Sequence, residues 1–199
     1  MSEAGAQDIE YRRYILWFVY ACIIYSIIGF SWGAVVGMVP DLRDFINNRP
    51  FGNLIMLGHG HINLLGWVEM AIFAALYYVV VRVVNRPIYS LKLVKVHFWI
   101  HNFGLLGMVI SFVAAGALGG MSSMTMPIEE VNKVVRPLMI LVGTFGLLVL
   151  SANIIWGYNL FRTAVGWGER AKLASAGPGR PGWALTENRS PAMDGDDAA

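Results

Sequence analysis

Long apolar runs alternate with short polar stretches along most of this chain. Four runs, at residues 14–39, 54–81, 96–118 and 134–160, consist almost entirely of hydrophobic residues. A helix needs about 20 such residues to cross about 30 Å of hydrocarbon, and the runs lack the alternation of a membrane β-strand. We therefore expect an all-α integral membrane protein, built as a four-helix bundle.

The polar stretches between the runs predict the connections. Residues 41–50 have room for a short surface helix, and Asn85-Arg86-Pro87 is typical of a tight turn. Prolines, glycines and scattered charges fill residues 174–199 and favour disorder. We divide the chain into an N-terminal cytoplasmic segment (1–13), a four-helix membrane domain (14–165) and a disordered cytoplasmic tail (166–199).

Composition and charge support the membrane class. The 199 residues are 56% hydrophobic and 14% charged, whereas soluble domains carry about 25% charged residues. A net charge of +2 is too small to imply a polyanionic partner such as nucleic acid, and the apolar runs make membrane lipid the expected partner. Eleven lysines and arginines lie on the side of the two termini and four on the other. The positive-inside rule then places both termini in the cytoplasm of a multi-pass protein of the bacterial-type inner membrane.

The four histidines carry the candidate chemistry. His59, His61, His97 and His101 all lie in or beside the apolar runs, where polar groups are costly and mark function. A neutral imidazole can ligate heme iron. At about 100° per residue, His59 and His61 point to different sides of their helix, whereas His97 and His101 share a face. The single cysteine, Cys22, excludes a disulfide framework and a cysteine-based metal site.

The histidines fall at two depths. Counted from the turn near Pro87, His61 lies about 40 Å away and His101 about 20 Å away, so one heme cannot be held by both within one chain. A second ligand at the level of His61 would be a histidine of a second protomer in a homo-oligomer, or one of five methionines: Met38, Met121, Met124, Met126 and Met139.

One acidic residue lies within a span. Glu69 follows His61 by about two helical turns. Two roles are open for this carboxyl group: proton transfer, or a bond to a hydroxyl or arginine at a subunit contact.

The segment His61-Ile62-Asn63-Leu64-Leu65-Gly66-Trp67, with its helix ending at Tyr77-Tyr78, resembles the second membrane helix of subunit I of heme-copper oxidases. The segment is similar to that of nitric oxide reductase and the C-family cytochrome c oxidases. The stretches 58–61 and 97–104 also resemble short four-helix relatives of subunit I. The resemblance implies that His61 ligates a low-spin heme b and that Asn63 is a polar group beside it.

From the resemblance we expect an electron-transfer subunit that binds one or two hemes b and exchanges electrons between quinol and a redox partner such as cytochrome c. His59 is the competing ligand, and His97 and His101 would hold a second heme or a quinone headgroup. The helices that carry the binuclear site of subunit I are absent, which favours an oxidoreductase component over a complete oxidase. Two alternatives remain: a heme-free or heme-sensing assembly subunit beside other respiratory membrane subunits, and a copper or iron enzyme built on His97 and His101.

Overall fold

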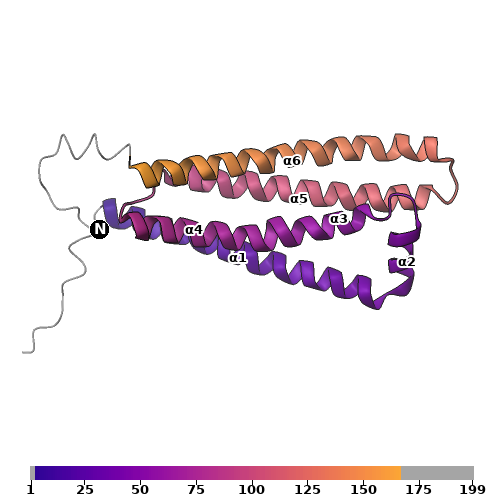
Figure 1. The fold of residues 1–199 in the computed structure, drawn as a ribbon, viewed down its shortest axis with the longest axis horizontal. Coiled ribbons are helices and arrows are strands. Elements are labelled where there is room, and N and C mark those ends of the chain that lie inside the picture. Colours follow the sequence, from indigo (N-terminus) through magenta and orange to yellow (C-terminus); the bar gives the residue numbers. More distant parts are fainter. Residues whose placement is uncertain (1–2, 167–199) are drawn as a thin grey trace, which may run out of the picture.

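The computed structural model describes residues 3–166, and it is helical over nearly all of them. Figure 1 shows two antiparallel pairs of long helices side by side, with a short helix across one end. The elements are α1 (Glu3–Met38), α2 (Pro40–Asn48), α3 (Leu54–His61), η1 (Ile62–Val68), α4 (Glu69–Val84), α5 (Leu91–Ser122) and α6 (Ile128–Val165).

Four helical segments are long and apolar enough to cross a membrane: Ile9–Met38, Leu54–Val84, Leu91–Ser122 and Ile128–Val165. The predicted all-α membrane bundle is therefore confirmed. Most helix ends lie beyond the predicted apolar runs, and α1 already begins at Glu3. The end of α1 at Met38 and the start of the second span at Leu54 agree with the runs to within one residue. The tail predicted to be disordered lies, after Gly166, outside the described residues.

The predicted connections are present. The turn after α4 is built on Asn85, whose φ of 54° is left-handed, a conformation that asparagine tolerates better than most residues. Ser90 then caps α5, its hydroxyl accepting a 3.3 Å bond from the N–H of Leu93. The polar stretch between the first two spans forms α2, with Pro40 in its first turn.

The second span contains a π-helical segment that the sequence pattern did not predict. Within η1 the turn is wider, and the N–H of Glu69 bonds to the carbonyl of Leu64. In an α-helix this N–H would bond to Leu65, four residues back. Such π-bulges frequently occur at functional sites, and this one separates His61 from Glu69.

Close helix contacts depend on glycines. A Cβ at Gly66 of η1 would lie 2.7 Å from Cγ of Tyr25 on α1. A Cβ at Gly104 would lie 3.0 Å from the Phe145 carbonyl, and one at Gly107 would overlap the Phe145 ring. Small residues thus bring α1 against η1 and α5 against α6, as is common between membrane helices.

The place of Pro137 within its helix differs from the prediction. The apolar run predicted it in the first turn of the fourth helix, but α6 begins at Ile128 and contains Pro137 in its interior. The polar turns before the run are helical as well, since Pro127 and the acidic pair Glu129 and Glu130 favour a helix start there.

Candidate functional site

His97 and His101 of α5 lie at the centre of the bundle. Both side chains are 0% exposed, and their ring centroids are 6.0 Å apart. The ring of Phe73 on α4 lies 4.4 Å from that of His97 and 5.2 Å from that of His101. Phe18 of α1 stacks on His97 at 5.1 Å. The prediction that the two histidines share a helix face is confirmed, and that face is packed by aromatic rings.

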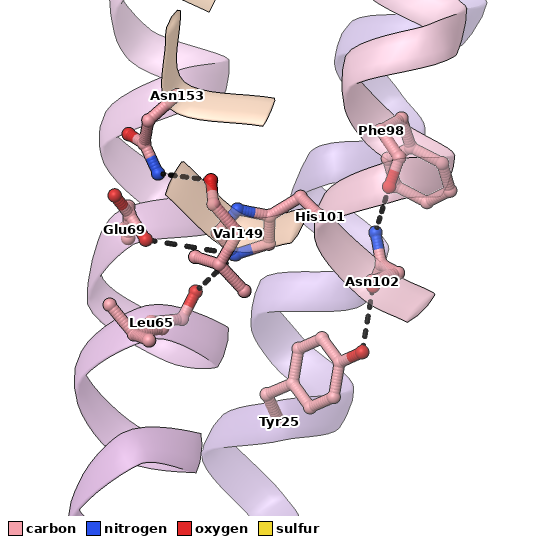
Figure 2. Close-up of polar contacts among 8 residues, drawn as sticks. All are labelled: Tyr25, Leu65, Glu69, Phe98, His101, Asn102, Val149 and Asn153. Atoms are coloured by element: carbon pink, nitrogen blue, oxygen red, sulfur yellow. Dashed lines mark hydrogen bonds and ion pairs between the residues drawn. The ribbon is translucent and has the colours of Figure 1, made fainter. Parts of the chain in front are cut away.

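The π-helical segment provides a partner for His101. The Leu65 carbonyl, which does not receive the Glu69 N–H, accepts a 3.2 Å hydrogen bond from Nε2 of His101 (Figure 2). Oε2 of Glu69 lies 3.6 Å from the same nitrogen, and the Glu69 carboxyl group also interacts with Asn153 of α6. Because a carbonyl can only accept, Nε2 carries the proton and a neutral His101 has its lone pair on Nδ1.

Tyr77 connects His97 to the end of the bundle. Its hydroxyl lies 3.1 Å from Nδ1 of His97 and interacts with the Asn159 side chain. Asn159, fully buried on α6, accepts from the N–H of Ser90 at 3.1 Å and donates to its carbonyl at 3.1 Å. The start of α5, the end of α6 and the middle of α4 are thereby joined by polar side chains.

His59 faces α1. Its Nε2 donates a 3.1 Å bond to the carbonyl of Gly29, and its own carbonyl accepts a 2.9 Å bond from the amide of Asn63. A Cβ at Gly29 would collide with the Asn63 side chain. A groove on this side is lined by Gly29, Phe30, Gly33, Ala34, His59, Gly60, Asn63 and Trp67.

His61 faces α5. Its Nδ1 donates a 2.7 Å bond to the carbonyl of Leu57, one turn earlier in the same helix, so a neutral ring has its lone pair on Nε2. The ring centroid lies 4.9 Å from that of Phe112. The prediction that His59 and His61 point to different sides is confirmed.

The two predicted depths are present as well. His61 contacts Phe112, which lies eleven residues after His101 on α5. At 1.5 Å per residue these two levels are roughly 16 Å apart. The structure thus joins His97, His101 and Glu69 in one cluster and keeps His59 and His61 apart from it.

Several polar contacts were missed by the sequence reasoning. Besides Tyr77 and Asn159, the hydroxyl of Tyr25 donates a 2.7 Å bond to Asn102, whose amide donates to the carbonyl of Phe98 at 2.7 Å (Figure 2). An asparagine inside an apolar run was the available signal, because a buried amide needs partners. Tyrosines give a weaker signal, since they are also common at membrane interfaces.

Fold and composition define a multi-pass helical membrane protein with imidazole groups at two depths. Residues 5–148 match the family model described as Cytochrome C and Quinol oxidase polypeptide I. The chain therefore belongs to this family, the heme-copper oxidase subunit I family that the motif around His61 resembles.

Curated relatives agree with the family. Cytochrome c oxidase subunit 1 of Rhodobacter capsulatus is 31% identical over 61% of this chain and 25% of its own length. The bacteroid cytochrome c oxidase subunit 1 homolog of Bradyrhizobium diazoefficiens is 33% identical over 54% of this chain and 21% of its own length. The Cbb3-type cytochrome c oxidase subunit CcoN1 of Stutzerimonas stutzeri is 28% identical over 54% of this chain and 24% of its own length. The chain thus spans about a quarter of these relatives' length. Four membrane-length helices and bacterial relatives place it in the bacterial inner membrane.

Proposed function

We propose that this chain is an electron-transfer component of a respiratory membrane complex and that His61 ligates a heme b. Membership of the oxidase subunit I family implies heme cofactors. The hydrogen bond of His61 is the observation that carries the assignment: Nδ1–H is held by the Leu57 carbonyl, which presents Nε2 as an iron ligand. Heme-ligating histidines are commonly oriented by such a bond from the other ring nitrogen.

The surroundings of His61 fit a porphyrin better than those of the other histidines. His61 is half-buried at the edge of the bundle beside an aromatic ring. The Nε2 proton of His59 is engaged by Gly29, which leaves Nδ1, the nitrogen nearer the backbone, as its free acceptor. His97 and His101 are enclosed by Phe18 and Phe73. We do not extend the proposal to this pair, so a second heme or a quinone headgroup there stays a prediction.

When bound, a heme supplies one-electron chemistry at its iron. The residues of this chain then have three tasks. Leu57 fixes the orientation and tautomer of the His61 ring, and Phe112 packs against one side of that ring. Asn63 donates to the His59 carbonyl and packs closely against Gly29 of α1. An apolar, low-dielectric surrounding would tune the reduction potential of a heme bound there.

Electron donors and acceptors belong to the same proposal. We expect exchange with quinol or cytochrome c inside a larger complex, or within a homo-oligomer, whose other chains complete the iron ligation. Large apolar side chains project outward from the bundle, among them Leu64 (63% exposed) and Ile110 (65% exposed). These faces suit lipid and neighbouring membrane helices equally.

The experiment is spectroscopic. The full chain, expressed with heme supply and purified in detergent, should show a Soret band and a low-spin EPR signal. His61→Ala should abolish the low-spin signal, and added imidazole should restore it by entering the space of the missing ring. His59→Gln is the matched control, because glutamine can still donate to Gly29 while lacking the imidazole ligand.

Two results would contradict the proposal. Loss of the signal in His59→Gln, with His61→Ala unchanged, would transfer the ligand role to His59. A heme-free protein that copurifies in fixed ratio with another respiratory subunit would support the assembly role instead.

A further inference from the structure

Every membrane-length span has a basic residue and an aromatic residue one helical turn apart at the same end of the bundle. α1 and α5 begin at this end, and α4 and α6 end there (Figure 1). The pairs are Arg13 and Trp17, Arg82 and Tyr78, Lys95 and Trp99, and Arg162 and Tyr158. In each pair the basic residue is nearer the helix end, so its Cα lies about 6 Å outside that of the aromatic residue. This order matches a bilayer interface, where aromatic rings lie at the headgroup level and basic side chains are attracted to anionic lipids.

Two of these pairs, on α1 and α5, lie side by side. The Trp17 ring is 6.0 Å from that of Trp99 and 5.5 Å from that of Phe98. Arg13 stands one turn before Trp17, with its guanidinium carbon 5.1 Å from the indole centroid. Lys95 stands one turn before Trp99 and therefore on the same face of α5. Because the two helices begin at the same end, the exposed residues Arg13 and Lys95 lie at a similar depth on neighbouring helices.

A hollow on the outer side of α1 adjoins this pair of cations. It is lined by Ile9, Arg12, Arg13, Leu16, Trp17 and Tyr20. Its arginines precede the apolar run of the first span, whereas Leu16, Trp17 and Tyr20 belong to the run itself. Among the side chains described at this end of the bundle, the one carboxyl group is that of Glu10, which accepts a 3.2 Å hydrogen bond from the Tyr14 hydroxyl. The surface therefore has an excess of positive charge beside an apolar base.

We propose that this surface binds the headgroup of one anionic phospholipid, with its phosphodiester between Arg13 and Lys95. A guanidinium group binds phosphate oxygens through paired N–H donors, and an ammonium group attracts them as a point charge. The acyl chains then lie along the exposed side chains of Leu16, Tyr20 and Trp99. A zwitterionic headgroup brings its own cation toward these basic residues and is disfavoured by like-charge repulsion. The site thus selects phospholipids whose headgroup has a net negative charge.

Lipid binding to the purified chain tests the proposal. The full chain in neutral detergent is titrated with phosphatidylglycerol or with phosphatidylcholine of the same acyl chains, and bound lipids are counted by native mass spectrometry. The unmodified chain should bind one phosphatidylglycerol more tightly than phosphatidylcholine. Arg13→Gln combined with Lys95→Gln should weaken phosphatidylglycerol roughly thirtyfold, because each basic residue near an anionic lipid contributes about fivefold. Phosphatidylcholine binding should not change, and the exchanged pair Arg13→Lys with Lys95→Arg should retain the preference.

Arg49→Gln combined with Arg136→Gln is the matched control, since it removes the same charge from exposed positions at the opposite end. Equal weakening in this control, or equal affinities for the two lipids in the unmodified chain, would overturn the proposal. Displacement of phosphatidylglycerol by inorganic phosphate would also overturn it, since the site would then bind a free anion. Circular dichroism identifies a double variant that fails to fold, in which case the single variants decide, each with an expected loss of about fivefold. No heme takes part, so failure of the His61 assignment leaves this test intact.

Discussion

The contact between Gly66 and Tyr25 gives a prediction whose size follows from the structure. In Gly66→Ala the new methyl group would lie 2.7 Å from Cγ of Tyr25 and 2.9 Å from its Cβ. Both atoms are near the backbone, so the side chain cannot rotate away. Overpacking of this kind costs about 1–3 kcal/mol, while alanine gains up to about 1 kcal/mol over glycine in a helix.

Gly143→Ala separates these two effects. A Cβ at Gly143 of α6 would meet nothing within 4 Å, so this variant gains helix propensity without a clash. The difference in the free energy of unfolding between the two variants is therefore the cost of pushing α1 away from η1. For a chain of this size it corresponds to a thermal midpoint roughly 2–12 °C lower in Gly66→Ala.

Circular dichroism in one detergent at one scan rate measures both midpoints. Equal midpoints would refute the reasoning, because they would mean that α1 and η1 are not in van der Waals contact at Tyr25. A lowered midpoint in Gly143→Ala would instead show that α6 is covered at a surface the described residues leave open.

Two further predictions address the ends of the bundle. Asn159→Leu removes both bonds to Ser90 and should lower the free energy of unfolding by roughly 1–3 kcal/mol; an unchanged denaturation midpoint would show that the α4–α5 turn holds without it. The predicted orientation can be tested by cysteine labelling in a chain whose native cysteine is replaced by serine. With both termini in the cytoplasm, Thr125→Cys should react with an impermeant maleimide on intact spheroplasts, whereas Lys92→Cys should react only after permeabilisation. The reverse labelling pattern would place the termini outside the cytoplasm.

The apolar runs were sufficient to predict the spans, because crossing a bilayer imposes a length and composition that few other structures need. The turn at Asn85 and the opposed faces of His59 and His61 followed from local stereochemistry and helical periodicity in the same way. Counting residues from that turn also separated the levels of His61 and His101, since antiparallel helices joined by a short turn remain in register.

The partner of Glu69 could not be predicted in this way. The sequence left two roles open for Glu69, proton transfer or a bond to a hydroxyl or arginine at a subunit contact, and it did not predict that Glu69 lies beside His101. That contact depends on how α4 and α5 are rotated against each other and on the wider turn in η1, and no residue in Ile62–Val68 marks such a turn. Asn159 and Tyr77 were missed for a related reason: they meet only after α4, α5 and α6 have packed.

The wider turn also sets the angular phase between the two halves of the second span. Each residue inserted into or deleted from an α-helix rotates everything after it by about 100°. A regular α-helix of the same length in place of η1 would leave His61 where it is but rotate Glu69 by about 100° and swing its carboxyl group away from α5. The relation between His61 and Glu69 on this one helix thus depends on the wide turn, and loss of that turn at constant length would alter the relation without altering either side chain.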